Sequence, residues 1–398
     1  MKKNIYILLL IICSCQNSEF KDDLKTIEFN YNMPDENLKI SDICNQITYV
    51  ELETSDLSLV GNVTKIVASE DYIIILDKTG KLVVFNSNGK FLNIINHQGR
   101  GPNEYTEITD FSFLEEDGLI AIYSRVNDRS VYLYSLDGKY VDDFKIKYES
   151  ENLYNFNNNF IFYNSHFFRN QSNYYSLNIT SRQGKHINQL MRKELETSYP
   201  FFYQYDKKNK LFKLGDELVF WEKGFDNGVD TIWKINKKFE VYPKYKLNIG
   251  GEKFPLSRYA DKNKIPFREK LEKTDLMNYY ESNKYVFFEI INESKFCRFV
   301  YDKKETNLKR IYEGKTEKQF EIMLNNDLDG GTSFWPIGNI SDDKMFMLIQ
   351  GYEIKDFLER QGEDFVAKNP VARQKLLKMV KNSKISDNPI LMVATLKE

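Results

Sequence analysis

Histidine and cysteine are scarce in this sequence, and their scarcity argues against the commonest metal sites. The 398 residues include three histidines and four cysteines. The histidines, His97, His166 and His186, are not spaced as an i,i+4 pair, and the chain contains no HExxH or CxxC motif. A transition-metal site is therefore not expected. The G-x-S-x-G motif of serine hydrolases is missing as well, so the sequence displays no catalytic constellation.

An excess of charge of either sign is also missing. Lysine and arginine total 56 against 58 aspartate and glutamate residues, which gives a net charge of −2. Such a balance provides no positive field for nucleic acid, so we expect no nucleic-acid partner. Proline is scarce, whereas 29 Phe and 26 Tyr contribute to an aromatic content of 15%. Short aromatic and β-branched runs, cut by Gly, Asn and Asp, are typical of many short antiparallel strands.

An apolar run near the N-terminus has the features of a targeting segment. Two lysines precede residues 5–12, which are too few to cross a bilayer as a helix. The run ICSC at 12–15 resembles a bacterial lipobox, with Cys15 as the lipid-modified first residue of the mature protein. The small residue Ser14 before Cys15 suits the shallow pocket of a signal peptidase. An ordinary secretory peptide with an incidental cysteine is the alternative.

This interpretation divides the chain into three parts. Residues 1–14 are the expected signal peptide, residues 15–44 a lipidated tether and lead-in, and residues 45–398 the folded domain. Gln16 follows the lipidation site where an Asp would favour inner-membrane retention in Gram-negative bacteria. We therefore expect a cell-envelope lipoprotein of the outer membrane, and the sequence leaves its periplasmic or surface exposure open.

Two cysteines remain in the mature chain beyond the anchor. Cys44 lies at the edge of the tether, and Cys297 lies inside an apolar strand-like run. A disulfide between them is compatible with an oxidising compartment. We favour a buried free thiol at Cys297, because free cysteine behaves as a small apolar residue.

Glycine-marked turns recur at nearly constant spacing. Gly89, Gly138 and Gly184 each separate two strand-like runs and are 49 and 46 residues apart. Asn followed by Gly between apolar runs is a strong hairpin signal, and the spacing matches the period of a four-stranded propeller blade. Looser copies of the unit continue along the chain, at 231–235 with a turn at 237–238, at 296–301 with a turn at 303–304, and at 345–350 with 390–396.

These repeats predict an all-β fold, a six-bladed β-propeller. A ring of blades must close, because free sheet edges promote aggregation. Residues 47–52 form a lone strand before the first blade and residues 390–396 end the chain. We therefore predict that these N-terminal and C-terminal strands pair within the last blade. A β-sandwich is the alternative, but its turns would lack the longer period.

Two stretches depart from the strand pattern. Residues 253–284 are expected to leave the ring between strands and to be partly helical over 267–280. Asn369 and Pro370 form a typical helix start, with Asn as the N-cap and Pro as the first helical residue. The spacing of apolar residues after them predicts a helical insertion over 352–384 in the last blade, packed across one face of the disc.

Four segments resemble the six-bladed β-propeller lipoproteins of Bacteroidetes, a family related in architecture to the NHL and TolB-like propellers. They are ITYVELET at 47–54, GRGPNEY at 99–105, NDLDGG at 326–331 followed by FWP at 334–336, and DNPILM at 387–392. Asn103 departs from the usual glycine of the second segment. The resemblance implies the six-bladed fold and a role in envelope systems that sense or acquire nutrients. It implies no particular reaction.

The GRGPNEY segment supplies three candidate ligand-binding residues, Arg100, Glu104 and Tyr105. One interpretation is a structural crossover between blades, in which glycines permit the turn and Glu104 caps amides. The other places Arg100 at the central funnel, where its guanidinium would bind a carboxylate or a phosphate. Trp335 is a further candidate, because indole rings stack on sugars and peptides, although core packing is the alternative.

The NDLDGG segment supplies a candidate calcium site. Asn325, Asp327, Asp329 and Gly330 resemble the opening of an oxygen-rich calcium loop, with Asn325 as its first position and Asp327 and Asp329 as the candidate ligands. The twelfth position of that pattern is Pro336, which has no carboxylate to complete the site. A tight turn with exposed carboxylates is the alternative, and weak calcium binding is the only cofactor that the sequence suggests.

The sequence therefore favours a non-catalytic binding or scaffold protein anchored to the envelope. The expected partner of the propeller face is a protein, a peptide or a glycan. The alternative is an envelope hydrolase or lyase that acts in the propeller funnel, because carboxylates from separate blades can meet without a sequence motif. The fold alone does not decide between them.

Substitution Cys15→Ala tests the anchor. The variant should be released from membranes, because stable attachment depends on the acyl chains. Fractionation of cells into soluble and membrane parts measures the effect. Unchanged membrane retention would refute the lipid anchor.

Overall fold

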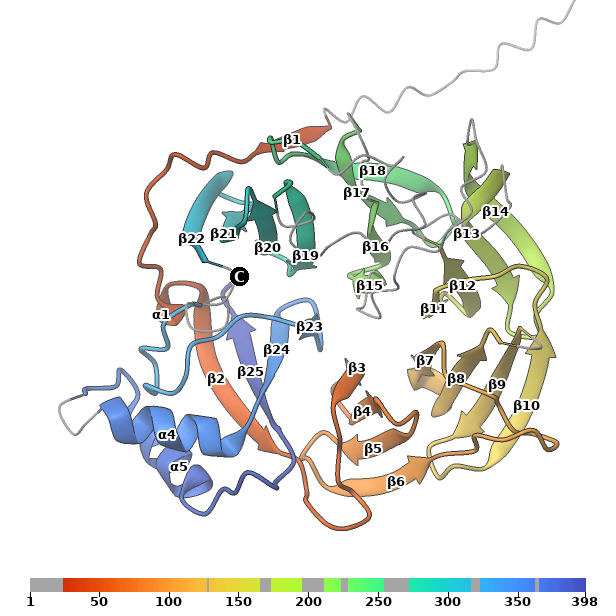
Figure 1. The fold of residues 1–398 in the computed structure, drawn as a ribbon, viewed down its shortest axis with the longest axis horizontal. Coiled ribbons are helices and arrows are strands. Elements are labelled where there is room, and N and C mark those ends of the chain that lie inside the picture. The colour runs from red at the N-terminus through yellow and green to blue at the C-terminus, as the bar shows by residue number, and fades with distance from the viewer. Residues whose placement is uncertain are drawn as a thin grey trace, which may run out of the picture.

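The computed structural model describes residues 24–126, 129–164, 173–194, 211–222, 228–253, 272–315, 323–361 and 365–398. Six sheets of antiparallel strands surround a common axis (Figure 1). The predicted all-β, six-bladed propeller is confirmed, and the β-sandwich is not observed. Cys15 and residues 1–14 lie outside the described residues.

Blades 1 to 5 are each built on four sequential strands, with the first strand innermost. The first three blades are β3 (Val63–Ala68), β4 (Tyr72–Asp77), β5 (Leu82–Asn86) and β6 (Phe91–Ile95); β7 (Asp110–Leu114), β8 (Leu119–Ser124), β9 (Ser130–Ser135) and β10 (Tyr140–Lys145); and β11 (Asn152–Phe156), β12 (Asn159–Tyr163), β13 (Asn173–Ser181) and β14 (His186–Glu194). A short 3₁₀ helix at Glu115–Asp117 joins β7 to β8.

The next three blades complete the ring, and blade 6 takes its outermost strand from the start of the chain. They are β15 (Leu211–Leu214), β16 (Glu217–Glu222), β17 (Asp230–Ile235) and β18 (Val241–Asn248); β19 (Asp275–Glu281), β20 (Tyr285–Asn292), β21 (Lys295–Asp302) and β22 (Asn307–Lys315); and β23 (Gly338–Asn339), β24 (Lys344–Ile349), β25 (Ile390–Leu396) and β2 (Cys44–Glu51).

The core lies between neighbouring blades, which stack face to face. The middle strands are buried on both faces, so β4 and β5 consist almost entirely of buried residues. This explains their continuous apolar sequences, which lack the alternation of a half-exposed strand. The outer strand β10 has partly or fully exposed residues throughout, because no sheet covers its outer edge.

The ring closes as predicted. Strand β2 pairs antiparallel with β25, with Cys44 opposite Leu396 and Glu51 opposite Ile390. The closing strand begins three residues earlier than the predicted 47–52. The pairing joins the two ends of the chain within one blade, so the ring is closed by backbone hydrogen bonds.

The recurring turn glycines are explained by contacts between blades. Gly89 has a φ of +80°, and a Cβ atom on it would lie 2.0 Å from the carbonyl oxygen of Glu51 in the preceding blade. The backbones therefore approach too closely for any side chain. Two more turns repeat this arrangement, with Gly138 against Asn93 and Gly184 against Phe144.

The lead-in is part of the folded body. Strand β1 (Lys25–Glu28) pairs in parallel with β18 as a fifth strand of blade 4. The chain then passes outside blade 5 to reach α1 (Ile40–Ile43) and β2 (Figure 1). Phe29 packs edge-on against Phe288 and Phe299, at centroid distances of 5.1 and 5.2 Å. Nothing in the sequence indicated this strap over blades 4, 5 and 6.

The helical insertion is present as α4 (Gly351–Gln361) and α5 (Pro370–Val380). The side chain of Asn369 accepts a hydrogen bond from the Ala372 amide, so the predicted helix start is confirmed. The helices lie at the outer rim beside β2, not across a face of the disc (Figure 1). The reason is that their apolar side chains pack around Ile390 at the start of β25. Among the described residues, no helix is long and apolar enough to span a membrane.

One secondary-structure prediction was wrong. The stretch 267–280 was expected to be partly helical, but its last part belongs to the strand β19. Residues 254–271 lie outside the described part of the chain. Met277 and Tyr279 lie on this strand, where cross-strand packing against β20 replaces the helical pattern.

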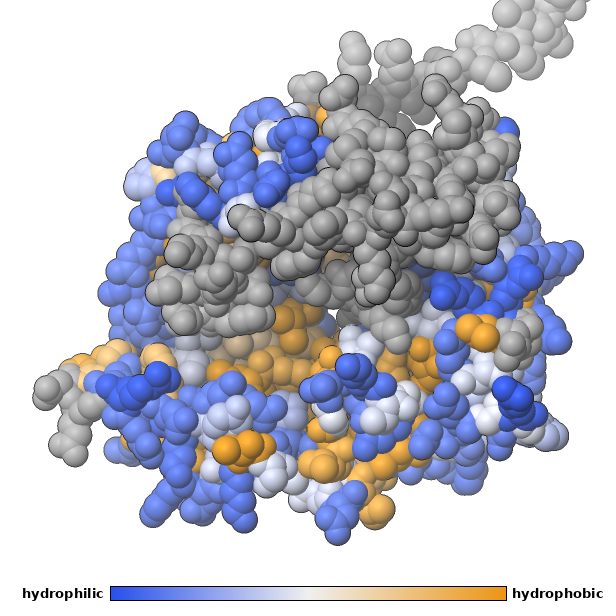
Figure 2. Space-filling model, in the orientation of Figure 1, coloured by the Kyte–Doolittle hydropathy of each residue, from blue (hydrophilic) through white to orange (hydrophobic). Residues whose placement is uncertain are grey.

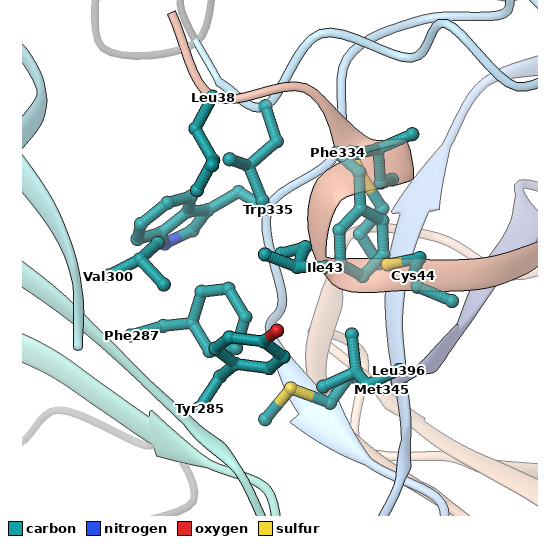
Figure 3. Close-up of a cluster of buried hydrophobic side chains, with 14 of the residues drawn as sticks. Leu38, Ile43, Cys44, Tyr285, Phe287, Val300, Phe334, Trp335, Met345 and Leu396 are labelled. Atoms are coloured by element: carbon teal, nitrogen blue, oxygen red, sulfur yellow. The ribbon is translucent and has the colours of Figure 1, made fainter. Parts of the chain in front are cut away.

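Both cysteines of the mature chain are free and buried. Cys44 lies in the cluster that joins the lead-in to blades 5 and 6, where Figure 3 shows it near Phe334 and Leu396. Cys297 belongs to a different cluster between blades 4 and 5. The free thiol favoured for Cys297 is confirmed.

Substitution Gly89→Ala should destabilise the ring. A positive φ costs a non-glycine residue roughly 1 kcal/mol, and the forced separation from Glu51 adds a further ~2 kcal/mol. The control is Gly250→Ala, because Gly250 has a φ of +61° but no atom within 4 Å of the added Cβ. Equal losses of unfolding free energy in the two variants, measured by denaturant titration, would contradict the close packing of blades.

Candidate functional site

The central channel is narrow, and a buried ion pair lies beside it. The innermost strands enclose a cavity of about 180 Å³ that includes Ser112, Asn155 and Asn339. Lys65 from β3 forms a buried ion pair with Asp110 from β7 at 2.6 Å. Asp110 also accepts a hydrogen bond from the Leu153 amide in β11, at 2.8 Å. These bonds link the inner strands of blades 1, 2 and 3, so Lys65 has a structural partner.

Blade 6 has an unusually short innermost strand. Strand β23 contains two residues, whereas the innermost strands of the other blades contain four to seven. In the described part of the chain, β23 pairs with β24 only at Phe346 and Met345. Met347, Leu348 and Ile349 of β24 therefore extend beyond β23 without an inner neighbouring strand.

A pocket of about 450 Å³ lies where β23 fails to cover β24. Its walls include Met323, Met347 and Leu348 from blade 6 and its preceding loop. Val63 and Ile337 also line it and are 37% and 38% exposed, which is high for apolar side chains. Figure 2 shows apolar surface gathered near the centre of the ring on this side of the molecule.

A buried ion pair forms the polar part of this pocket. Arg298 from β21 bonds to Glu289 from β20 through both Nε and Nη2, at 3.1 and 2.9 Å. The guanidinium also lies over the rings of Trp335 and Phe296, 5.0 and 5.1 Å from their centroids. Burial lowers the pKa of Arg298, and the neighbouring Glu289 carboxylate opposes that shift. Asn278 donates to the second oxygen of Glu289.

The pocket continues as a groove beside the helical insertion. A second cavity of about 880 Å³ shares Met323, Met347 and Leu348 with the first. Its other wall is α4, which presents Phe357 together with charged side chains. Those charged residues are Glu353, Asp356 and Arg360. We call the two connected cavities the blade 6 groove.

The GRGPNEY residues lie elsewhere. Arg100 is exposed on the crossover from β6 to β7 and does not line the channel cavity or the blade 6 groove. Glu104 accepts a hydrogen bond from the Gly101 amide at 2.7 Å. Tyr105 is fully buried, and its hydroxyl accepts a bond from the His97 amide. The placement of Arg100 at the funnel is therefore corrected, and the structural crossover is what the fold contains.

Asp327 and Asp329 are engaged by the chain itself. Asp327 accepts bonds from the amide and hydroxyl of Ser41 and pairs with Lys368 at 2.8 Å. Burial by itself would raise the pKa of Asp327. The bonds from Lys368 and Ser41 lower the pKa by more, so it lies below its usual value. Asp329 is 1% exposed, and burial raises its pKa. The turn is thus not exposed as expected, and the described residues contain no cluster of three metal-ligating side chains.

Trp335 is the one predicted site residue that the groove contains. Its ring is 3% exposed and packs edge-on against Phe287, at a centroid distance of 5.4 Å (Figure 3). It therefore serves the core and also forms part of the pocket wall. Sequence reasoning missed Arg298 and Glu289, because ordinary strand sequences gave no signal that ring geometry would bring them to Trp335.

The groove is better suited to binding than to acid–base chemistry. Its described lining residues include no histidine or cysteine. The carboxylate of Glu289 is engaged by Arg298 and Asn278. Glu353 and Asp356 are exposed on α4. The lining combines adaptable methionines with a few fixed polar groups, which is typical of ligand pockets.

Substitution Arg298→Met should destabilise the protein by about 3 kcal/mol, because it leaves the Glu289 carboxylate buried without its charge partner. The double variant Arg298→Met, Glu289→Met should recover part of this loss, since no unpaired charge remains. Urea unfolding of wild type, both single variants and the double variant measures the coupling. A double variant no more stable than Arg298→Met would show that lost packing on Trp335 dominates.

Solved structures share the propeller fold. A Bacteroides fragilis protein described as a "putative exported protein" superposes with a TM-score of 0.67 at 19% identity, covering 94% of this chain and 99% of that one. The WD40 domain of Toxoplasma gondii coronin has a TM-score of 0.40 at 10% identity, covering 79% and 73%. Moraxella catarrhalis BamB has a TM-score of 0.36 at 9% identity, covering 68% and 76%. No curated protein matches the sequence.

A family model described as a domain of unknown function, DUF4934, matches residues 24–395. The match includes the lead-in strand β1, all six blades and most of the closing strand β25. The relationship to NHL and TolB-like propellers stays a prediction. The chain belongs to the DUF4934 family.

Proposed function

We propose that this protein is an envelope-anchored binding module whose blade 6 groove holds a segment of a partner protein. The observation that carries the proposal is the groove itself. It combines the apolar walls at Met323, Met347 and Leu348 with exposed charges on α4. Its two cavities, of about 450 and 880 Å³, fall in the size range of ligand pockets.

The composition of the groove favours a partner with apolar and basic groups. Apolar side chains that stay partly exposed, such as Val63 and Ile337, gain free energy when a ligand covers them. On α4, two acidic residues, Glu353 and Asp356, stand against one arginine, Arg360, so the α4 wall of the groove carries a small excess of negative charge. A basic side chain on the partner would complement this end.

The envelope location rests on the N-terminal segment and on a relative. Cys15 and Gln16 favour a lipid anchor in the outer membrane, as argued from the sequence. The Bacteroides fragilis protein with the same fold is described as exported, which supports the same compartment. The lead-in ties the chain after the tether to the rim of blade 4, so the anchor would leave the groove, at the centre and blade 6, uncovered.

A hydrolase or lyase in the funnel has less support. The channel cavity is small, and Lys65, one of the two lysines that line it, is bound to Asp110. In the groove, Glu289 is engaged by Arg298. The other carboxylates that line these cavities, on Glu115, Glu353 and Asp356, belong to exposed residues, so binding is the better proposal.

Substitution Asp356→Lys tests the groove. On affinity purification from detergent-solubilised membranes, the variant should recover at least about tenfold less partner protein than wild type. The reason is that the added lysine repels a basic partner. The matched control is Glu359→Lys, since Glu359 is exposed on the same helix but does not line the groove. Quantitative mass spectrometry compares the three preparations. Equal recovery of every membrane protein with Asp356→Lys and wild type would refute the proposal.

A further inference from the structure

The inner edge of β24 carries backbone groups that no strand of the described residues pairs. In β24, the even-numbered residues face β23, because Ile340 donates to the Lys344 carbonyl at 2.8 Å and Ile337 to the Phe346 carbonyl at 2.8 Å. Leu348 is the next residue of this series, so its N–H and C=O point to the same side. The described residues supply no backbone partner there, because β23 ends at Gly338.

The sequence before β23 keeps this edge open. Continuing the register beyond Gly338 would place Pro336 opposite Leu348. Proline has no N–H and cannot continue a ladder, so strands end or bulge at it. The neighbouring Trp335 is held by its core contact with Phe287 in blade 5. The missing inner strand is thus a fixed property of blade 6.

The open edge runs along the blade 6 groove. The side chain of Leu348 lines both cavities, so its backbone lies where the two cavities join. On one side are Met323 and the Arg298-stacked ring of Trp335, and on the other is α4 with its acidic residues. A ligand in the groove would meet unpaired N–H and C=O groups, an apolar wall and negative charge at once.

We propose that the groove binds an extended peptide, which adds to β24 as a continuation of β23. Its backbone would pair with Leu348, an apolar side chain would contact Met323 and Trp335, and a basic side chain would lie beside Glu353 and Asp356. This inference rests on the proposed function and specifies its ligand. Strand addition supplies affinity through main-chain bonds, and flanking pockets supply specificity. A glycan matches the edge less well, because it has no regular series of amide donors and acceptors.

The propeller already accepts an added strand at another sheet edge. Strand β1 lies parallel to β18 with Lys25 opposite Tyr245, and Ile27 of the added strand is 3% exposed. A four-residue strand is therefore enough to pair with a blade of this ring and to bury a side chain between blades. The uncovered part of β24, from Met347 to Ile349, is three residues long, and within it the N–H and C=O of Leu348 point to the open side.

The test uses the full-length protein and a fluorescent probe peptide, acetyl-Lys-Val-Lys-Val-Lys-Val-amide. Two further probes carry N-methyl groups, which remove N–H donors. One probe is methylated on the odd-numbered amides and the other on the even-numbered amides, because only one of these sets faces β24 in a bound strand. We expect about a tenfold or greater loss of affinity for one methylated probe and little change for the other. Fluorescence anisotropy measures all three. Equal affinities of the three probes, or no binding of the parent probe, would overturn the strand-addition inference.

Charge variants separate this inference from the proposed function. Asp356→Lys should weaken binding of the lysine probe and strengthen binding of a probe in which Glu replaces Lys. Glu359→Lys should leave both affinities unchanged. If Asp356→Lys weakens binding but methylation has no effect, the groove binds peptides without strand addition, and only the inference fails. If the probe binds but neither Asp356→Lys nor N-methylation alters its affinity, the peptide binds outside the groove, and the proposed function fails too. Binding of soluble peptidoglycan fragments in place of the probe would assign the groove to a glycan and overturn the inference.

Discussion

Backbone hydrogen bonds between β2 and β25 join residues from the two ends of the chain, and the rest of the ring depends on this joint. The hairpin turn at Gly89 rests on the end of β2, so blade 1 is positioned by blade 6. The helical insertion packs around Ile390, at the start of β25. Strand β24, which carries the groove, pairs with β25 on its other side. Closure and the candidate site therefore belong to one sheet.

Blade 6 differs from the other blades in how it completes its sheet. In the other blades the innermost strand pairs with at least four residues of its neighbour. The paired charges of Lys65 and Asp110 connect two of these inner strands beside the channel. In blade 6, Pro336 and the close approach of Gly338 to Phe346 restrict β23 to two residues. The uncovered part of β24 lowers the stability of the blade, because its backbone groups lack strand partners. A bound ligand that pairs with these groups can offset this loss. We regard this incomplete blade as the functional specialisation of the ring.

Local patterns allowed much of the fold to be predicted from the sequence. Turn glycines at Gly89, Gly138 and Gly184 marked successive blades, because both the turn and the neighbouring blade exclude a side chain. The helix start at Asn369 was likewise a local signal. The groove was not predictable, since Arg298 and Trp335 meet only through the ring geometry. The added strand β1 gave no signal either, because its four residues are too short to show a period.

The lead-in also restricts the order in which the molecule can be assembled. Glu28 contacts Asn248, a partner 220 positions later in the chain, so β1 has no binding surface until four blades have been synthesised. Contacts of such long sequence separation slow folding and leave early segments unpaired. An emerging polypeptide would therefore leave β1 and β2 without their partner strands, β18 and β25, for much of its synthesis, whereas the first blades can pair their own sequential strands at once.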